Sequence, residues 1–272
     1  MSGIKRTFAS LDEAREGAFI GYVCAGDPDP EFTVEQVLRL SRAGTDIIEL
    51  GLPFSDPLAD GPVIQAAMKR SLENGYSTHA MISTIKAIRK AGMMKPLVVM
   101  TYFNPVLQFG IDKFCDALAE SGADGVLVVD LPPEESQEID ARSAERGLDM
   151  IRLVTPTTSD KRMTRILATA SGFVYAVSAA GTTGIRAELP PSAPALIRRA
   201  REKTSLPVAL GFGISTPEQV RSALSQGASG VVEGSALIAT YADLLGDRTR
   251  ALDAVEAHAK RMKQATVRAS LH

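Results

Sequence analysis

Short runs of apolar residues recur along the chain, and glycine, proline or charged residues bound most of them. Runs of this length without polar alternation are typical of parallel strands that are buried on both faces. The pattern predicts eight strands: Phe19–Cys24, Ile47–Gly51, Leu97–Tyr102, Gly125–Val129, Met150–Val154, Phe173–Val177, Val208–Gly211 and Gly230–Glu233.

Amphipathic segments with helical spacing separate these runs, and several end at a glycine that can supply a left-handed cap. They predict helices at Glu31–Ala43, Thr78–Ala91, Ile111–Ser121, Glu134–Arg146, Lys161–Ala170, Ala193–Lys203 and Pro217–Gln226. We expect an extra helix at Ile4–Arg15 before the first strand and a long closing helix at Arg248–Val267.

Eight strand–helix units over about 250 residues match the number of units and the usual length of a TIM (β/α)8 barrel. An open, doubly wound parallel sheet also alternates strands with helices and is the alternative. No linker or low-complexity stretch divides the chain, so we expect residues 1–272 to form a single barrel domain.

Composition and charge narrow the classes of function. The 272 residues are 45% apolar and 23% charged with a net charge of −2, which gives no basic footprint for nucleic acid. No apolar stretch approaches the roughly 20 residues that a membrane span needs. The first residues lack the apolar segment of a signal peptide, so we expect a cytoplasmic protein.

Residues that directly follow the strands matter most, because a TIM barrel places its active site at the C-terminal ends of its strands. Glu49 lies among apolar residues at the end of the second strand, where burial would raise its pKa and suit it to proton transfer. A structural salt bridge is the alternative for Glu49. Asp60 follows in an acidic, proline-rich loop and could act in catalysis or cap the helix that opens at Pro62.

Glycines after the seventh and eighth strands predict a phosphate site, because they let backbone N–H groups approach an anion. These are Gly213 and Gly234, followed by Ser235 and a short helix at Ala236–Tyr241. The long segment from residue 178 to 191 predicts a lid that carries Thr183 and Gly184. Tight turns and an unimportant loop are the alternatives.

The positions of lysine and histidine bear on how a barrel could cleave a carbon–carbon bond, which commonly needs a Schiff-base lysine or a metal ion. No lysine ends a predicted strand, and the three histidines lie at a helix start, in the closing helix and at the C-terminus, so we expect neither. The remaining chemistry that we expect is proton transfer by carboxyl groups to and from a phosphorylated substrate. An apolar pocket for the substrate is predicted near the mouth, although the same residues could simply fill the barrel: Tyr22, Met100, Tyr102, Leu127, Val129, Tyr175 and Phe212.

The segment Glu49–Gln65, ELGLPFSDPLADGPVIQ, resembles the signature of the tryptophan synthase alpha subunit. The resemblance continues over most of the chain in AGDPDP, YFNPVLQFG, DGVLVVDLPPEES, VTPTTSD, GFVYAVS, GTTG, GFGIS and EGSALI. It implies a lyase that splits indole-3-glycerol phosphate into indole and D-glyceraldehyde 3-phosphate.

The resemblance also implies roles for individual residues. Glu49 would donate and accept the protons of a retro-aldol cleavage, Asp60 would bind the indole N–H, and Tyr175 would assist near the glycerol hydroxyls. The phosphate would be bound by Gly184, Gly213, Gly234 and Ser235. Tyr22, Met100, Leu127, Phe212 and Thr183 would form the indole pocket and lid.

The resemblance further implies a beta subunit that uses pyridoxal phosphate, in an alpha2-beta2 heterotetramer, with no cofactor on this chain. The segments Pro53–Asp60 and Asn104–Gly110 would face that partner. Two places depart from the family pattern: the lid residues Ala179, Ala180 and Thr182, and Glu233 before the phosphate glycine. If Glu233 faced the phosphate, repulsion would cost about 1 kcal/mol or more.

Three rival functions stay open on the sequence alone. A stand-alone indole-3-glycerol phosphate lyase would share every catalytic residue. A phosphosugar epimerase or isomerase on the same barrel would leave the pair Glu49 and Asp60 unexplained. A non-catalytic regulatory subunit would bind phosphate only to tune a partner.

Overall fold

The structure is a computed structural model that describes residues 2–177, 189–211 and 213–267. The predicted strands are all present, and the fifth is divided in two. The bounds are β1 Ala18–Cys24, β2 Ile47–Gly51, β3 Leu97–Thr101, β4 Gly125–Val128, β5 Asp149–Met150, β6 Arg152–Val154, β7 Val174–Val177, β8 Val208–Gly211 and β9 Gly230–Glu233.

Neighbouring strands are parallel, in the order β5-β4-β3-β2-β1-β9-β8-β7-β6. The first strand therefore pairs with both the second strand and the last one, so the sheet curls round instead of staying open. β5 and β6, at the two ends of this order, are consecutive in the chain and meet at Ile151. The TIM barrel prediction is confirmed, and the open-sheet alternative is wrong.

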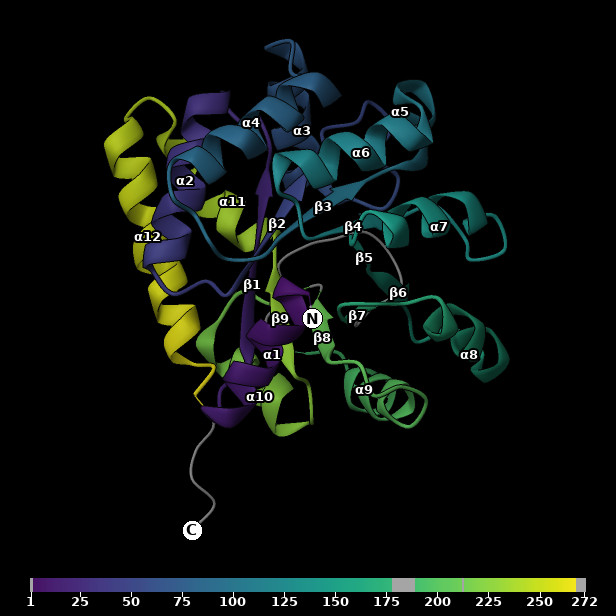
Figure 1. Cartoon of the computed structure of the whole chain (residues 1–272). Helices are drawn as coiled ribbons and strands as arrows, with labels where there is room; N and C mark the ends of the chain where they lie inside the picture. The colour runs from purple at the N-terminus through teal and green to yellow at the C-terminus, as the bar shows by residue number, and fades with distance from the viewer. Residues whose placement is uncertain (1, 178–188, 212, 268–272) are drawn as a thin grey trace.

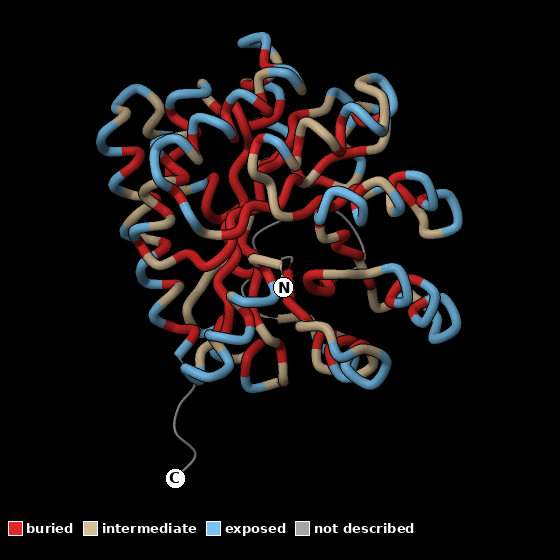
Figure 2. Tube along the Cα trace, viewed as in Figure 1, coloured by how far each residue is buried: buried red, intermediate tan, exposed pale blue. Residues whose placement is uncertain are grey.

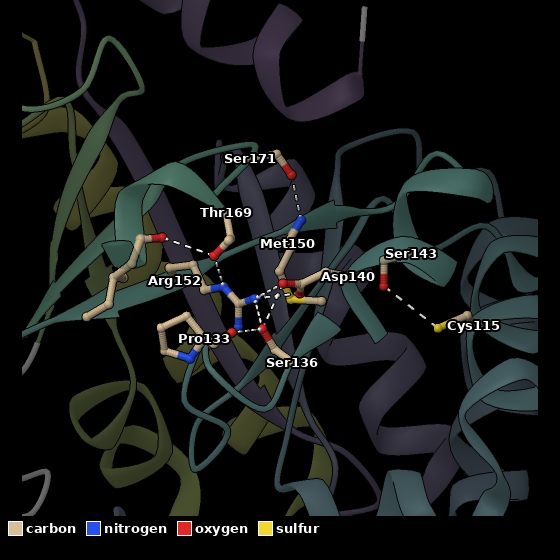
Figure 3. Close-up of polar contacts among 10 residues, drawn as sticks. Cys115, Pro133, Ser136, Asp140, Ser143, Met150, Arg152, Thr169 and Ser171 are labelled. Atoms are coloured by element: carbon tan, nitrogen blue, oxygen red, sulfur yellow. Dashed lines mark hydrogen bonds and ion pairs between the residues drawn. The ribbon is translucent and has the colours of Figure 1, made fainter. Parts of the chain in front are cut away.

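The divided strand is stabilised by buried polar contacts (Figure 3). The Arg152 side chain is only 4% exposed, and its Nη2 donates a hydrogen bond of 2.7 Å to Oγ of Ser136 and one of 2.6 Å to the Asp140 carboxylate. Nε of Arg152 donates to Oγ1 of Thr169 at 3.2 Å. These bonds join β6 to the residues around α7 (Gln137–Glu145) and α8 (Asp160–Ala168).

The remaining helices surround the sheet, with α1 in front of the strands in Figure 1. Their bounds are α1 Gly3–Glu13, α2 Pro30–Arg42, α3 Pro62–Glu73, α4 Thr78–Lys90, α5 Phe103–Phe109, α6 Ile111–Ser121, α9 Ala193–Arg201, α10 Pro217–Ser225, α11 Ser235–Tyr241 and α12 Arg248–Gln264, with a 3-10 turn at Ala242–Leu244. The sequence pattern did not predict α5.

Two apolar clusters form the core, one between strands and helices and one inside the barrel. Buried residues line the strands while exposed residues lie on the outer helical turns (Figure 2). Ile4 and Phe8 of α1 belong to the inner cluster, and the ring centroid of Phe8 lies 5.9 Å from that of Phe173. The extra helix thus covers the N-terminal end of the barrel and leaves the opposite end as the mouth.

Candidate active site

A pocket opens at the C-terminal mouth of the barrel and combines two carboxyl groups with a largely apolar wall. Its lining comes from most of the strands and from the segments that follow them. The lining residues are Tyr22, Glu49, Ala59, Asp60, Ile64, Met100, Leu127, Val129, Leu153, Tyr175, Gly213, Ile214, Val232, Gly234, Ser235 and Ala236. A concave, mostly apolar site with a few convergent polar groups is typical of a small-molecule pocket.

Glu49 on β2 points into this pocket and is 1% exposed. Among the described residues neither of its carboxyl oxygens has a hydrogen-bond partner, so the salt-bridge alternative is wrong. Burial, and after it the negative charge of Asp60, raises the pKa of Glu49 to about 8. Glu49 therefore carries a proton at neutral pH and can donate it.

Asp60 reaches the same pocket from the loop between β2 and α3, and it is fully buried. The Tyr102 hydroxyl donates a hydrogen bond of 2.7 Å to Oδ2, whereas Oδ1 has no partner among the described residues. Burial raises the pKa of Asp60 to about 6, although the bond from Tyr102 opposes this rise. At neutral pH Asp60 is thus ionised beside a protonated Glu49, and this difference assigns the two carboxyl groups separate tasks.

The helix-cap alternative for Asp60 is also wrong. α3 begins at Pro62 with Gly61 as its N-cap residue, and no side chain caps its first turn. The Asp60 side chain turns into the barrel mouth instead, where it is fixed by Tyr102.

The contact between Tyr102 and Asp60 is a feature that the sequence reasoning missed. Tyr102 was predicted only as part of the apolar wall, yet its hydroxyl also accepts a hydrogen bond of 3.1 Å from the backbone N–H of Ala59. One signal was available, because a buried tyrosine usually pairs its hydroxyl.

Tyr175 on β7 lines the pocket and is 8% exposed. A β-carbon on Gly211 of the neighbouring strand would lie 2.4 Å from Cε1 and 2.5 Å from the hydroxyl oxygen of Tyr175. The tyrosine ring therefore lies directly against the backbone of Gly211. Burial, followed by the charges of Glu49 and Asp60, raises the pKa of the Tyr175 hydroxyl. The structure thus brings all three predicted catalytic residues into one pocket.

Three of the four predicted phosphate residues also line this pocket: Gly213, Gly234 and Ser235. Gly213 has a φ of 84°, a conformation that disfavours other residues. Gly234 is the N-cap residue of α11, and no side chain caps that helix, so its first N–H groups receive no side-chain oxygen there. Gly184, the fourth predicted residue, lies outside the described residues.

The predicted indole pocket is described only in part. Tyr22, Met100 and Leu127 line the pocket as predicted. Phe212 and Thr183 lie outside the described residues, as do Ala179, Ala180 and Thr182. The wall also contains apolar residues that the sequence reasoning did not select: Ile64, Leu153, Ile214 and Val232.

Glu233, the unusual residue before Gly234, faces away from the pocket. Its neighbour Val232 lines the pocket, while the Glu233 side chain meets His258 of α12 with Oε1 2.8 Å from Nε2. Glu233 is fully buried, and this burial raises its pKa while His258 lowers it. The repulsion considered for an inward-facing Glu233 therefore does not arise.

Within residues 2–177, 189–211 and 213–267, no group of three or more histidine, cysteine, aspartate or glutamate side chains is arranged to hold a metal ion. Among the helices of the same residues, none is long and apolar enough to cross a membrane.

Two large apolar side chains are exposed on the segments predicted to face a partner. Leu58, between β2 and α3, is 86% exposed, and Leu107 of α5 is 52% exposed. A surface groove beside Leu58 is lined by Phe54, Ser55, Asp56, Pro57, Leu58, Gln65, Lys69, Leu72 and Glu73.

Comparisons with known proteins agree on one family. The family model for the tryptophan synthase alpha chain matches residues 8–267. The alpha chain of Carboxydothermus hydrogenoformans is 47% identical over 238 residues, which cover 88% of each chain. The alpha chain of Gluconobacter oxydans is 46% identical over 90% of each chain.

Solved structures of the same family share the fold. A chain of Mycobacterium tuberculosis tryptophan synthase superposes with a TM-score of 0.90 at 35% identity, covering 98% of this chain and 99% of that one. The tryptophan synthase subunit alpha of Legionella pneumophila gives 0.89 at 37% identity, with 98% of both chains covered.

Proposed function

Because this chain belongs to the tryptophan synthase alpha chain family, we propose that the mouth pocket is its active site and that Glu49, Asp60 and Tyr175 act there. The chain is a carbon–carbon lyase that cleaves indole-3-glycerol phosphate into indole and D-glyceraldehyde 3-phosphate. The observation that supports this placement best is the pair of buried carboxyl groups with separated pKa values in one pocket.

Glu49 transfers both protons of the reaction. Its carboxyl group, protonated at neutral pH, gives a proton to the indole carbon that bears the glycerol chain. The resulting carboxylate then takes the proton of the adjacent hydroxyl, and the carbon–carbon bond breaks as that oxygen becomes the aldehyde. The bonding electrons pass into the ring, so indole leaves with the proton from Glu49, and Glu49 is protonated again.

Asp60 stabilises the positive charge that the ring nitrogen carries between these steps. Its Oδ1 faces the pocket without a partner among the described residues and can accept the indole N–H, while Tyr102 holds Oδ2. Tyr175, next to the same carboxyl groups, contacts the glycerol hydroxyls.

The phosphate is bound by backbone N–H groups at Gly213, Gly234 and Ser235 and by the Ser235 hydroxyl, with Gly184 added from the lid. The indole ring lies against Tyr22, Met100, Leu127 and Phe212. Closure of the lid brings Thr183 toward the catalytic carboxyl groups. We expect a cytoplasmic protein with no cofactor or metal of its own.

The partner is the beta subunit, which carries pyridoxal phosphate and receives the indole in an alpha2-beta2 heterotetramer. The segments Pro53–Asp60 and Asn104–Gly110 form the contact surface, which the exposed Leu58 and Leu107 support. Contact at the loop that carries Asp60 would couple the two active sites.

The experiment that tests the activity measures indole release from indole-3-glycerol phosphate by the purified chain, with and without a tryptophan synthase beta subunit. We expect slow release that rises strongly with the beta subunit. Fast release by the chain alone would favour the stand-alone lyase, and binding without release under any condition would favour a regulatory subunit.

The contact surface has a matched test. Leu58→Asp should abolish co-sedimentation with the beta subunit, because it places a charge in an apolar contact. Met94 is also 86% exposed but lies outside both segments, so Met94→Asp should leave the complex intact. Equal behaviour of the two variants would contradict this surface.

A further inference from the structure

Tyr22 presents an unpartnered hydroxyl group to the active site. It lies on β1 as the direct register partner of Glu49 on β2, and both side chains line the mouth pocket. Tyr22 is 2% exposed, and its hydroxyl oxygen is buried with no hydrogen-bond partner among the described residues. The Cys24 thiol, two residues further along β1, interacts with the Tyr22 hydroxyl only weakly, because sulfur is a poor hydrogen-bonding atom.

The other tyrosines make this hydroxyl an exception. Of the five in the chain, Tyr76 donates to Thr84 at 2.9 Å, Tyr102 to Asp60 and Tyr241 to Asp27 at 2.7 Å, and Tyr175 also has an interaction. A buried hydroxyl without a partner destabilises the free protein. Inside a ligand pocket, such a group indicates that the ligand supplies the partner.

Two glycines define where the Tyr22 ring lies. A β-carbon on Gly234 would lie 3.6 Å from the β-carbon of Tyr22, so the base of the ring is beside the proposed phosphate site. A β-carbon on Gly51 would lie 2.2 Å from the Tyr22 hydroxyl oxygen, so its tip lies against the backbone two residues beyond Glu49. The ring therefore spans the distance between the phosphate end and the carboxyl end of the pocket.

We propose that the Tyr22 hydroxyl donates a hydrogen bond to a hydroxyl oxygen of the substrate's glycerol chain. This inference rests on the proposed function, which places that chain between the phosphate and Glu49. Backbone N–H groups bind the phosphate and Oδ1 of Asp60 accepts the indole N–H, whereas the oxygen atoms of the two glycerol hydroxyls can accept a further hydrogen bond beside their contacts with Glu49 and Tyr175. Tyr22 thereby selects a hydroxylated chain in addition to packing against the indole ring.

The test compares the substrate with indole-3-propanol phosphate, which keeps the ring and the phosphate but lacks both hydroxyls. In Tyr22→Phe, kcat/KM for indole-3-glycerol phosphate should fall about three- to tenfold, as for one lost neutral hydrogen bond. The dissociation constant of the propanol analogue should stay unchanged. The chain contains no tryptophan, so the indole fluorescence of the analogue reports its binding without a tryptophan background from the protein.

The outcomes separate this inference from the function on which it rests. Equal losses for both ligands, or no loss for either, would overturn the proposed hydrogen bond. If the wild-type chain neither released indole nor bound the analogue, the proposed function itself would fail.

The free energy of unfolding gives a second test, because removing a hydroxyl group that only stabilises the fold would lower it. Tyr22→Phe removes an unpartnered group, so its urea midpoint should equal or exceed that of the wild type. Tyr76→Phe is the matched control, because it removes a buried hydroxyl bonded to Thr84 outside the pocket and should lower the midpoint. A loss in Tyr22→Phe as large as that in Tyr76→Phe would show a bond within the free protein and overturn the proposal.

Discussion

The charge on Glu49 should destabilise the native protein as pH rises, and Glu49→Gln should remove this effect. The usual pKa of 4.5 applies to the unfolded chain, whereas burial and Asp60 raise the native pKa to about 8. Between these values the native state holds a proton that the unfolded state has lost. Stability therefore falls as pH rises through this window, since it decreases wherever the native state binds more protons.

The size of the effect follows from the two pKa values. At pH 7 the medium lies 2.5 units above the unfolded pKa of 4.5 and still below the native one. At about 1.4 kcal/mol per unit, holding the proton on Glu49 at pH 7 costs the native state about 3 kcal/mol relative to the unfolded chain. Because Glu49 is 1% exposed, solvent does little to screen this cost. Glutamine has nearly the same shape as the protonated acid and does not titrate.

The assay is urea unfolding followed by far-ultraviolet circular dichroism from pH 5 to pH 8. The free energy of unfolding of Glu49→Gln should exceed that of the wild type by about 1 kcal/mol at pH 5 and by about 3 kcal/mol at pH 7. The titration of Asp60 is common to both proteins and largely cancels in the difference. A difference that stays flat or changes sign across this range would refute the raised pKa of Glu49.

Three further changes have expected outcomes. Tyr102→Phe removes the bond that lowers the pKa of Asp60, so the acid limb of the pH profile of kcat/KM should move to higher pH. An acid limb at the wild-type pH would show that Tyr102 does not set the pKa of Asp60. His258→Ala leaves the Glu233 carboxyl group buried without its hydrogen-bond partner and should cost about 1 to 3 kcal/mol in urea unfolding, a result that an unchanged midpoint would rule out. Gly213→Ala places a β-carbon at a φ of 84° and should weaken phosphate-ester binding in a fluorescence titration, where unchanged affinity would argue against this site.

The barrel could be predicted because its strands are buried on both faces and appear as continuous apolar runs. The location of Glu49 at the mouth could be predicted for a related reason, since it lies near the end of such a run and the C-terminal ends of the strands form the mouth of the barrel. The division at Ile151 could not, because Met150–Val154 reads as one run and only its pairing with two different neighbours separates the halves.

Side-chain directions and long-range contacts were beyond the sequence pattern. The run that ends at Glu233 is buried on both faces, so alternation gave no sign that this side chain turns outward to α12. The bond between Tyr102 and Asp60 joins two loops that are separated by 42 positions in the sequence. The parallel pairing of β2 with β3, the strands that precede these loops, brings them together.

Indole release under single-turnover conditions by wild-type and Glu49→Gln chains tests the central role of Glu49 most directly. Both proteins should bind indole-3-propanol phosphate, because glutamine preserves the shape of the pocket. Release from indole-3-glycerol phosphate should fall about a hundred- to ten-thousandfold in the variant, as for a lost general acid and base. A variant that binds the analogue and still releases indole at the wild-type rate would contradict proton transfer by Glu49.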